Sequence, residues 1–198
     1  MNKILLCLTA GLIVAPPALT AQEEQRDVHV RNDCRLAAQI IRTGEPAPHR
    51  EWAYGAIRAC DQTGGPALAA AWTQTLPSDR DRLAKLAGAS RHFPTRELFN
   101  AVRAVAEDPG AGTTVRVYAL GLLASFAQPG IYLDMRDLLE PRPGRLARTW
   151  TMSGDAALNE RGELVNVLPE VRALLDELRS ADDAVVANAA RSFISILP

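Results

Sequence analysis

The chain of 198 residues carries 22 Lys and Arg against 23 Asp and Glu, which gives a formal net charge of −1. This balance argues against nucleic acid or an anionic membrane as a partner, because either would require a clustered basic surface. The length is enough for a single domain with a sizeable core.

The first 21 residues have the pattern of a secretory signal peptide. Lys3 supplies a positive start, an apolar run of 11 residues follows over 4–14, and small residues end the segment at Ala21. A run of this length is too short to cross a bilayer, which needs about 20 apolar residues. We predict that the mature chain begins at Gln22, is exported to the periplasm or secreted, and is not inserted in a membrane. The alternative is a short N-terminal anchor, and mass spectrometry that found residues 1–21 on the exported protein would contradict cleavage.

After a polar N-terminal arm over 22–30, breaker clusters divide the chain into segments that each have room for one helix. Apolar positions within these segments follow the helical period, and no β-type alternation competes over 31–139. The sequence therefore predicts an all-α domain over 31–198. The breaker clusters of Pro, Gly, Ser, Thr and Asp lie at residues 44–48, 63–66, 77–78, 93–94, 108–110 and 129–130.

Two cysteines remain after processing, and the helices predicted over 31–42 and 49–60 bring them together. These helices are joined by the turn at 44–48 and should be antiparallel, which places Cys34 and Cys60 at the same end of the hairpin. An even pair of cysteines in an exported chain is expected to be oxidised. Closing this loop should stabilise the N-terminal hairpin by about 3 to 4 kcal/mol. The alternative is two separately buried thiols.

The helix predicted near 113–127 is apolar nearly all round, with Arg116 as its only charge. Such a helix must be covered on several sides, as happens to the inner helix of a stacked helical array. A helical bundle would bury it too. One apolar face contains Val115, Tyr118, Ala119, Leu122 and Phe126, and the second contains Val117, Leu120, Gly121 and Ala124.

The last two predicted helices each have one apolar face. Pro169 can begin the first of them, and Asp182 is the expected N-cap of the second. The first face contains Val171, Leu174, Leu175 and Leu178, and the second contains Val186, Ala190, Phe193 and Leu197.

A short pattern returns three times along the chain. An Arg or Val is followed three residues later by Ala and seven residues later by a large apolar residue. Successive Ala positions are 66 and then 70 residues apart, and two repeats of about 33 to 35 residues would fit each interval, which is the scale of helical-hairpin arrays. The copies are Arg50/Ala53/Ile57, Arg116/Ala119/Leu123 and Val186/Ala189/Phe193.

The segment 115–119, continuing to Leu123, resembles the second helix of a HEAT-type repeat, with 108–109 in the turn before it. Segments 50–57 and 183–189 are weaker relatives of the same core. This resemblance implies an α-solenoid of about four antiparallel helical hairpins, from a family mainly of scaffolds and adaptors. The third copy departs from the pattern by replacing Arg with Val. The copy expected near 80–91 departs further, with Leu83, Leu86 and Ser90 in place of the pattern.

Residues 140–166 do not fit the array, because they are rich in Pro, Gly and polar residues and show no helical pattern. A connection of this length is often functional or disordered, and we expect it to be more sensitive to proteases than the helices around it. The segments 149–152 and 164–167 have β-forming composition and predict a small hairpin.

Within this insertion, Trp150 with Arg145 and Arg148 would make a recognition patch. Exposed aromatic residues and Arg are the types most enriched at interface hot spots. The alternative is that Trp150 folds back onto the end of the helical core.

No motif for catalysis, a metal or a cofactor is found in the sequence. His29, His49 and His92 are interpreted as surface or capping residues. The acidic pairs Asp79/Asp81 and Asp182/Asp183 are interpreted as stabilising helix N-termini.

The sequence therefore predicts an exported scaffold or adaptor that binds a protein or peptide partner through the solenoid surface and the 140–166 insertion. The first alternative is an exported, hydrolase-like enzyme with Asp155, Glu160 or Glu163 as acid or base. The second alternative is a structural component of an envelope assembly, which predicts a large apolar self-interface.

Overall fold

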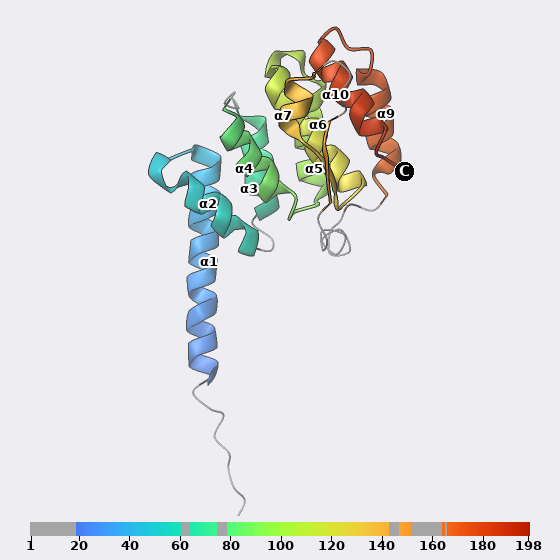
Figure 1. Cartoon of the computed structure of the whole chain (residues 1–198). Helices are drawn as coiled ribbons and strands as arrows, with labels where there is room; N and C mark the ends of the chain where they lie inside the picture. The colour runs from blue at the N-terminus through green and yellow to red at the C-terminus, as the bar shows by residue number, and fades with distance from the viewer. Residues whose placement is uncertain (1–18, 61–63, 75–78, 143–146, 152–163, 165) are drawn as a thin grey trace, which may run out of the picture.

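The computed structural model describes residues 19–60, 64–74, 79–142, 147–151, 164 and 166–198. The described part is mostly helical and contains one two-stranded sheet (Figure 1). The predicted all-α class is therefore confirmed, with a small β-element added.

The first hairpin consists of α1 (Leu19–Thr43) and α2 (Arg50–Ala56), with short 3₁₀ turns η1 (Ala47–His49) and η2 (Ile57–Ala59) beside α2. The helix expected over 31–42 begins earlier than predicted and includes residues 22–30, which were predicted as a separate arm. No Pro or Gly interrupts the chain from Ala18 to Thr43, and Glu, Gln and Arg favour the helix there. The N-terminal part of α1 projects from the helical body (Figure 1).

The other hairpins are formed by three helix pairs. Helices α1, α3 and α5 contact one another in succession, and α2, α4, α6 and α10 do the same. The described helices thus form two rows. Helix α9, which forms the last hairpin with α10, packs on α10 and α6. The bounds are α3 Gly64–Thr73, α4 Arg80–Ser90, α5 Arg96–Glu107, α6 Thr113–Ala127, α9 Leu168–Leu178 and α10 Ala184–Ile194.

The Ala and the large apolar residue of each copy of the repeated pattern are buried, and so are Arg116 and Val186, whereas Arg50 is partly exposed. The three Ala side chains, Ala53, Ala119 and Ala189, are each 0% exposed. Such small residues let neighbouring helices approach, while the large apolar residues fill the space between rows. The large apolar residues Ile57, Leu123 and Phe193 are all buried, and so are Leu83, Leu86 and Ser90 at the same spacing in α4.

Ser90 replaces an apolar residue of the pattern for an identifiable reason. Its Oγ accepts a hydrogen bond of 3.0 Å from Nε1 of Trp72 on α3, and both side chains are buried. A buried indole N–H needs such a partner.

The Arg residues of the pattern link each second helix to the end of the first. Arg116 is 5% exposed, and its Nε donates a 3.0 Å hydrogen bond to the backbone oxygen of Ala106 near the end of α5. Arg50 Nε donates in the same way to the backbone oxygen of Gly44 after α1. The two Arg positions therefore share a structural role, which is to fix the hairpin.

The final pair, α9 and α10, has the apolar faces predicted for it, since every residue assigned to them is buried. Pro169 lies in the first turn of α9 as expected. The predicted N-cap of α10 is wrong, because the carboxylate of Asp183 and not that of Asp182 accepts the backbone N–H groups of Val185 and Val186, at 2.9 and 3.1 Å. The two acids are adjacent, so the backbone conformation before the helix determines which carboxylate reaches its free N–H groups.

Helix α6 is the centre of the molecule. All of its residues from Val115 to Phe126 are buried, as the apolar sequence predicted. Helix α7 (Met135–Leu139) packs on it at Gly121, where an added Cβ would come within 2.4 Å of Cε of Met135. The glycine therefore lets α7 lie close to α6.

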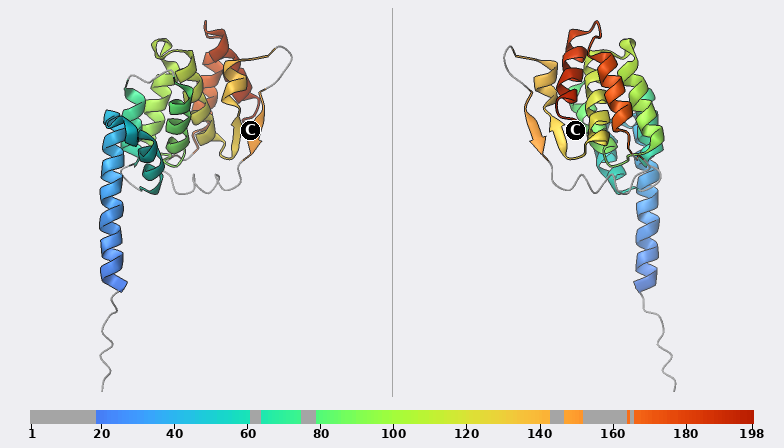
Figure 2. Two further views of the ribbon diagram at one scale, coloured as in Figure 1. Left: turned by 60° about the vertical axis from the view of Figure 1, so that its left-hand side comes forward. Right: turned by 90° about the vertical axis from the view of Figure 1, so that its right-hand side faces the viewer.

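The sheet pairs β1 (Ile131–Leu133) with β2 (Thr149–Thr151) in antiparallel fashion. The expectation of no strand over 31–139 is wrong, because a strand of three residues is too short to reveal alternation. The predicted hairpin partner at 164–167 is also wrong, since Leu164 and Val167 are buried in the core instead. Figure 2 shows the strands at the edge of the helical body, on the opposite side from α1.

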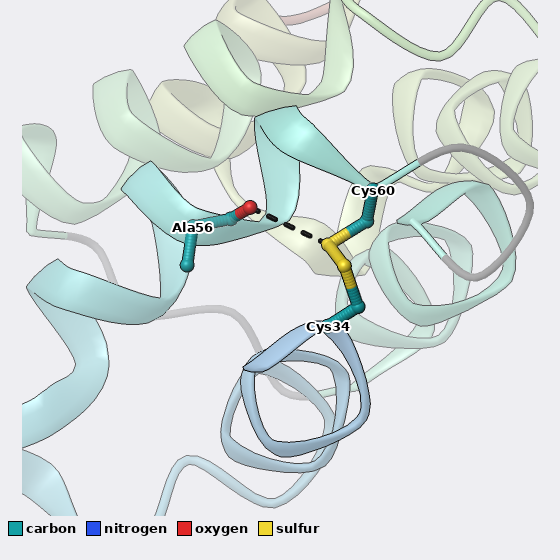
Figure 3. Close-up of a disulfide and its surroundings, with 3 residues drawn as sticks. All are labelled: Cys34, Ala56 and Cys60. Carbon is teal, nitrogen blue, oxygen red and sulfur yellow. Dashed lines mark hydrogen bonds between the residues drawn. A yellow bond between two sulfur atoms is a disulfide. The ribbon is translucent and has the colours of Figure 1, made fainter. Parts of the chain in front are cut away.

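The predicted proximity of the two cysteines is confirmed. The sulfur atoms of Cys34 and Cys60 lie 2.12 Å apart and the Cα atoms 5.6 Å apart, which is within the reach of a disulfide. The pair joins α1 to the end of the first hairpin next to the carbonyl oxygen of Ala56 (Figure 3).

Candidate interaction surface

Trp150 is the most exposed large apolar side chain in the described part of the chain. It lies in the middle of β2 and is 56% exposed. The alternative in which it folds onto the core is therefore not what the structure shows. Arg145, predicted as part of the same patch, lies outside the described residues.

Arg148 fixes the start of β2 to α7. Its Nη2 donates to Oδ2 of Asp134 at 2.6 Å, and its Nε donates to Oδ2 of Asp137 at 2.9 Å. The backbone takes part as well, because the Arg148 N–H donates to Asp137 and the Arg148 carbonyl accepts from the Asp134 N–H. The guanidinium thus pairs with two carboxylates and positions β2, although the Arg148 side chain is 64% exposed.

The partner strand anchors the other side of the ribbon. Trp150 is directly opposite Tyr132, so the two side chains lie on one face. Tyr132 is only 8% exposed, and the guanidinium carbon of Arg91 lies 4.1 Å from its ring centroid, at a distance typical of a cation–π contact. The exposed indole therefore has a support that is fixed from both α7 and the end of α4.

Two carboxyl groups near this surface, Asp137 and Glu140, form ion pairs with Arg side chains. Hydrogen bonding from Arg148 lowers the pKa of Asp137, and hydrogen bonding from Arg80 lowers the pKa of Glu140. A general acid would need a raised pKa. The pKa values of Asp137 and Glu140 are lowered instead, because ion pairing with Arg148 and Arg80 stabilises their charged forms.

Two further features lie on the helical surface. An open groove of ≈ 490 Å³ runs between the end of α3, the Ala-rich face of α5 and the turn before α6. A second exposed indole, Trp52 on α2, is 42% exposed. The groove lies on the helical surface, which the sequence predicted as a contact region.

Comparisons with known proteins add no family to this geometry. No family model matches the chain, and no curated protein or solved structure matches it significantly. The resemblance to HEAT-type repeats therefore rests on the residue pattern and on the helix contacts described above.

Metal and enzyme sites were also considered. Among the residues that the structure describes, no group of three or more His, Cys, Asp or Glu side chains could hold a metal ion. The acids predicted for the enzyme alternative, Asp155, Glu160 and Glu163, lie outside the described residues. Within the described ranges, no helix combines the length and apolarity needed to span a membrane.

Sequence reasoning missed Asp134 and Asp137, which hold Arg148. Their spacing of three residues at the start of a short helix is a signal for an N-cap, and Asp134 does accept the Arg136 N–H at 2.9 Å. Arg148 lies 11 residues after Asp137 and 14 residues after Asp134. Their pairing depends on the contact between β1 and β2, which the sequence did not predict.

Proposed function

We propose that this protein is an exported interaction module of the α-solenoid type, which binds a protein or peptide partner through Trp150 and the surface around β2. The solenoid part is supported by the two rows of successive helix contacts and by the burial of the Ala and large apolar residues of the repeated pattern. About four hairpins account for α1–α2, α3–α4, α5–α6 and α9–α10, with α7 and the sheet inserted before the last.

The observation that carries the proposal is the exposure of an indole on a strand that is paired and ion-paired to the helical body. Trp150 is 56% exposed on a strand that is fixed by pairing with β1 and by Arg148. Trp is among the residues most enriched at hot spots, where truncation to Ala costs about 2 kcal/mol or more. A side chain held in place before binding loses little conformational entropy when a partner covers it.

Export is supported by two independent features. Residues 1–21 have the charge, apolar run and small-residue end of a signal peptide. Cys34 and Cys60 lie at disulfide distance, and disulfides persist mainly in oxidising compartments. Cleavage after Ala21 would fall within the first turn of α1.

Two other classes compete with this proposal. An exported hydrolase would use an acid or base of the insertion, such as Asp155, Glu160 or Glu163. A structural envelope component would instead bury a large apolar face against itself or a neighbour. Both remain predictions from sequence, and the hydrolase class gives no reason for the exposure of Trp150.

The proposal is tested by partner capture with matched tryptophan variants. The mature chain, its Trp150→Ala variant and its Trp52→Ala variant are each used as bait for the envelope and secreted fractions of the native source. Trp52 is the control because it is also an exposed indole, but it lies on α2. We expect a partner identified by mass spectrometry to be retained by wild type and Trp52→Ala and lost from Trp150→Ala.

A partner that all three baits retain equally would contradict the role of Trp150. Loss from both variants, with unchanged thermal unfolding, would instead indicate a surface on the first hairpin as well. Deletion of residues 152–163 is a further variant, and unchanged binding would exclude those residues from the contact.

A further inference from the structure

A small cavity lies where the first two hairpins meet, separate from the surface around Trp150. It has a volume of ≈ 50 Å³ and receives residues from α1, α2, α3, α4 and the turn after α1. Gln74, one of its lining residues, is exposed, so the cavity is at the surface. The space exceeds the roughly 10 to 15 Å³ that a single water needs, so it has room for a small polar group.

Arg82 contributes an unsatisfied donor to this cavity. Its Nε is buried and has no hydrogen-bond partner among the residues that the structure describes. Buried polar atoms are nearly always paired, and an exception points to a missing water or ion. A guanidinium also carries a full positive charge, so an anion would satisfy it better than water would.

Three acids that lie close in sequence to residues of the cavity wall are engaged elsewhere. Glu45 pairs with Nη2 of Arg50 at 3.1 Å. Asp79 caps α4 by accepting the backbone N–H groups of residues 81 and 82. Glu51 pairs with Nζ of Lys85 at 2.7 Å. The charge of Arg82 is therefore not neutralised by these carboxylates.

Tyr54 supplies a second donor from the opposite hairpin. It lines the same cavity, and burial raises the pKa of its phenol, although Arg82 and Arg50 act to lower it. The group therefore stays a neutral hydroxyl at physiological pH and is able to donate. The walls also contain Arg50, which is already bonded to Gly44 and Glu45, and Gln74. Aliphatic side chains line another part of the walls, namely Ile40, Ile41, Leu83 and Leu86.

We propose that this cavity binds a single carboxylate group, with the Arg82 guanidinium and the Tyr54 hydroxyl as its donors. A carboxylate is planar and presents two oxygens, which matches the fork of N–H donors on Arg. The small volume and the partly apolar walls suit a monoanion better than a tetrahedral phosphate dianion. The carboxylate belongs either to a free small acid or to the C-terminus of a peptide.

The test is a titration of the ¹⁵N-labelled mature protein followed by NMR. Sodium acetate is compared with sodium chloride and sodium phosphate at equal ionic strength. We expect acetate, but not chloride or phosphate, to shift the Arg82 Nε–H signal and the backbone signals around Tyr54. An acetylated tri-alanine peptide with a free C-terminus is then compared with the same peptide as its amide. Tighter binding of the free acid than of acetate would identify a peptide C-terminus, and binding of acetate alone would identify a small acid.

Two variants make the assignment specific. Arg82→Met keeps an apolar stem and removes the guanidinium, so acetate binding should weaken about tenfold or more, as expected for loss of a charge-assisted pair. Arg136→Met, which removes an exposed Arg of α7, should bind acetate as wild type does. No response of wild-type Arg82 to acetate would overturn the proposal, as would an equal response to phosphate. The wild-type titration decides this even if Arg82→Met is poorly folded.

Discussion

Two buried polar side chains of the described residues, Arg116 and Ser90, each join two helices. Arg116 links α6 to the end of α5, and Ser90 of α4 receives the indole N–H of Trp72 on α3. Each contact satisfies a group that would be costly to bury without a partner. Such residues position the helices relative to one another, whereas the apolar residues supply most of the free energy of folding.

Asp183 is a second residue that joins two elements. It caps α10, and its other oxygen accepts a hydrogen bond from the Thr113 hydroxyl at the start of α6. We predict that Asp183→Ala lowers the free energy of unfolding by about 1 to 2 kcal/mol, as for loss of an N-cap. Asp182→Ala should change it by less than about 0.5 kcal/mol, as for an ordinary surface position. Urea unfolding of both variants checks this, and equal effects would contradict the assignment of the cap.

The effect of Asp183 should depend on pH. Burial acts to raise its pKa, but the hydrogen bonds from Thr113, Val186 and Val185 lower the pKa below the ordinary value of 3.8. A lowered pKa in the folded state stabilises the protein above the unfolded value, and this contribution is lost as the pH falls through the folded value. The difference between wild type and Asp183→Ala should therefore be full at neutral pH and shrink below about pH 4.

At the scale of elements, close approach depends on small residues at particular positions. Gly64 begins α3 beneath the ring of Phe93, and a Cβ at that position would come within 2.2 Å of the ring. We predict that Gly64→Ala lowers the free energy of unfolding by about 1 to 3 kcal/mol, because the buried ring would have to move. Thermal or urea unfolding measures this effect.

Gly55 provides the matched control for that substitution. It lies inside α2, and a Cβ there would meet nothing within 4 Å. Gly55→Ala should therefore stabilise the protein by up to about 1 kcal/mol through helix propensity alone. Destabilisation of similar size in both variants would show that the contact with Phe93 does not limit the approach of α3.

The sequence predicted helical elements well where breakers and apolar period agree. Helix α6 and the apolar faces of α9 and α10 were found because each contains several turns of consistent pattern. The β-ribbon was not found with its correct partner, since three-residue strands carry almost no period and exist through their pairing. The exposure of Trp150 was likewise undecided from sequence, because it depends on how Asp134 and Asp137 hold Arg148.

At the scale of the whole molecule, the first hairpin would be the terminal repeat of the proposed solenoid. Its helices have neighbours on one side only, and terminal repeats need additional stabilisation. The cysteine pair spans a sequence separation of 26 residues, for which chain entropy gives about 3 to 4 kcal/mol. We predict that the Cys34→Ser/Cys60→Ser double variant loses this amount and that a reductant destabilises wild type but not the variant.

Thiol labelling provides an independent check on the cysteine pair. Native mature protein should show no free thiol at Cys34 or Cys60 before reduction and two afterwards. Labelling of both residues in unreduced native protein would contradict the disulfide, and it would also remove one support for export.

The central claim is that the fold presents Trp150 for contact with a partner. The most direct measurement is the affinity of the captured, purified partner for wild type, Trp150→Ala and Trp52→Ala. We predict binding about 30-fold weaker for Trp150→Ala, which is the effect of losing about 2 kcal/mol. Trp52→Ala should bind within about twofold of wild type, as for a residue outside the contact. Equal affinities of all three proteins would contradict the claim.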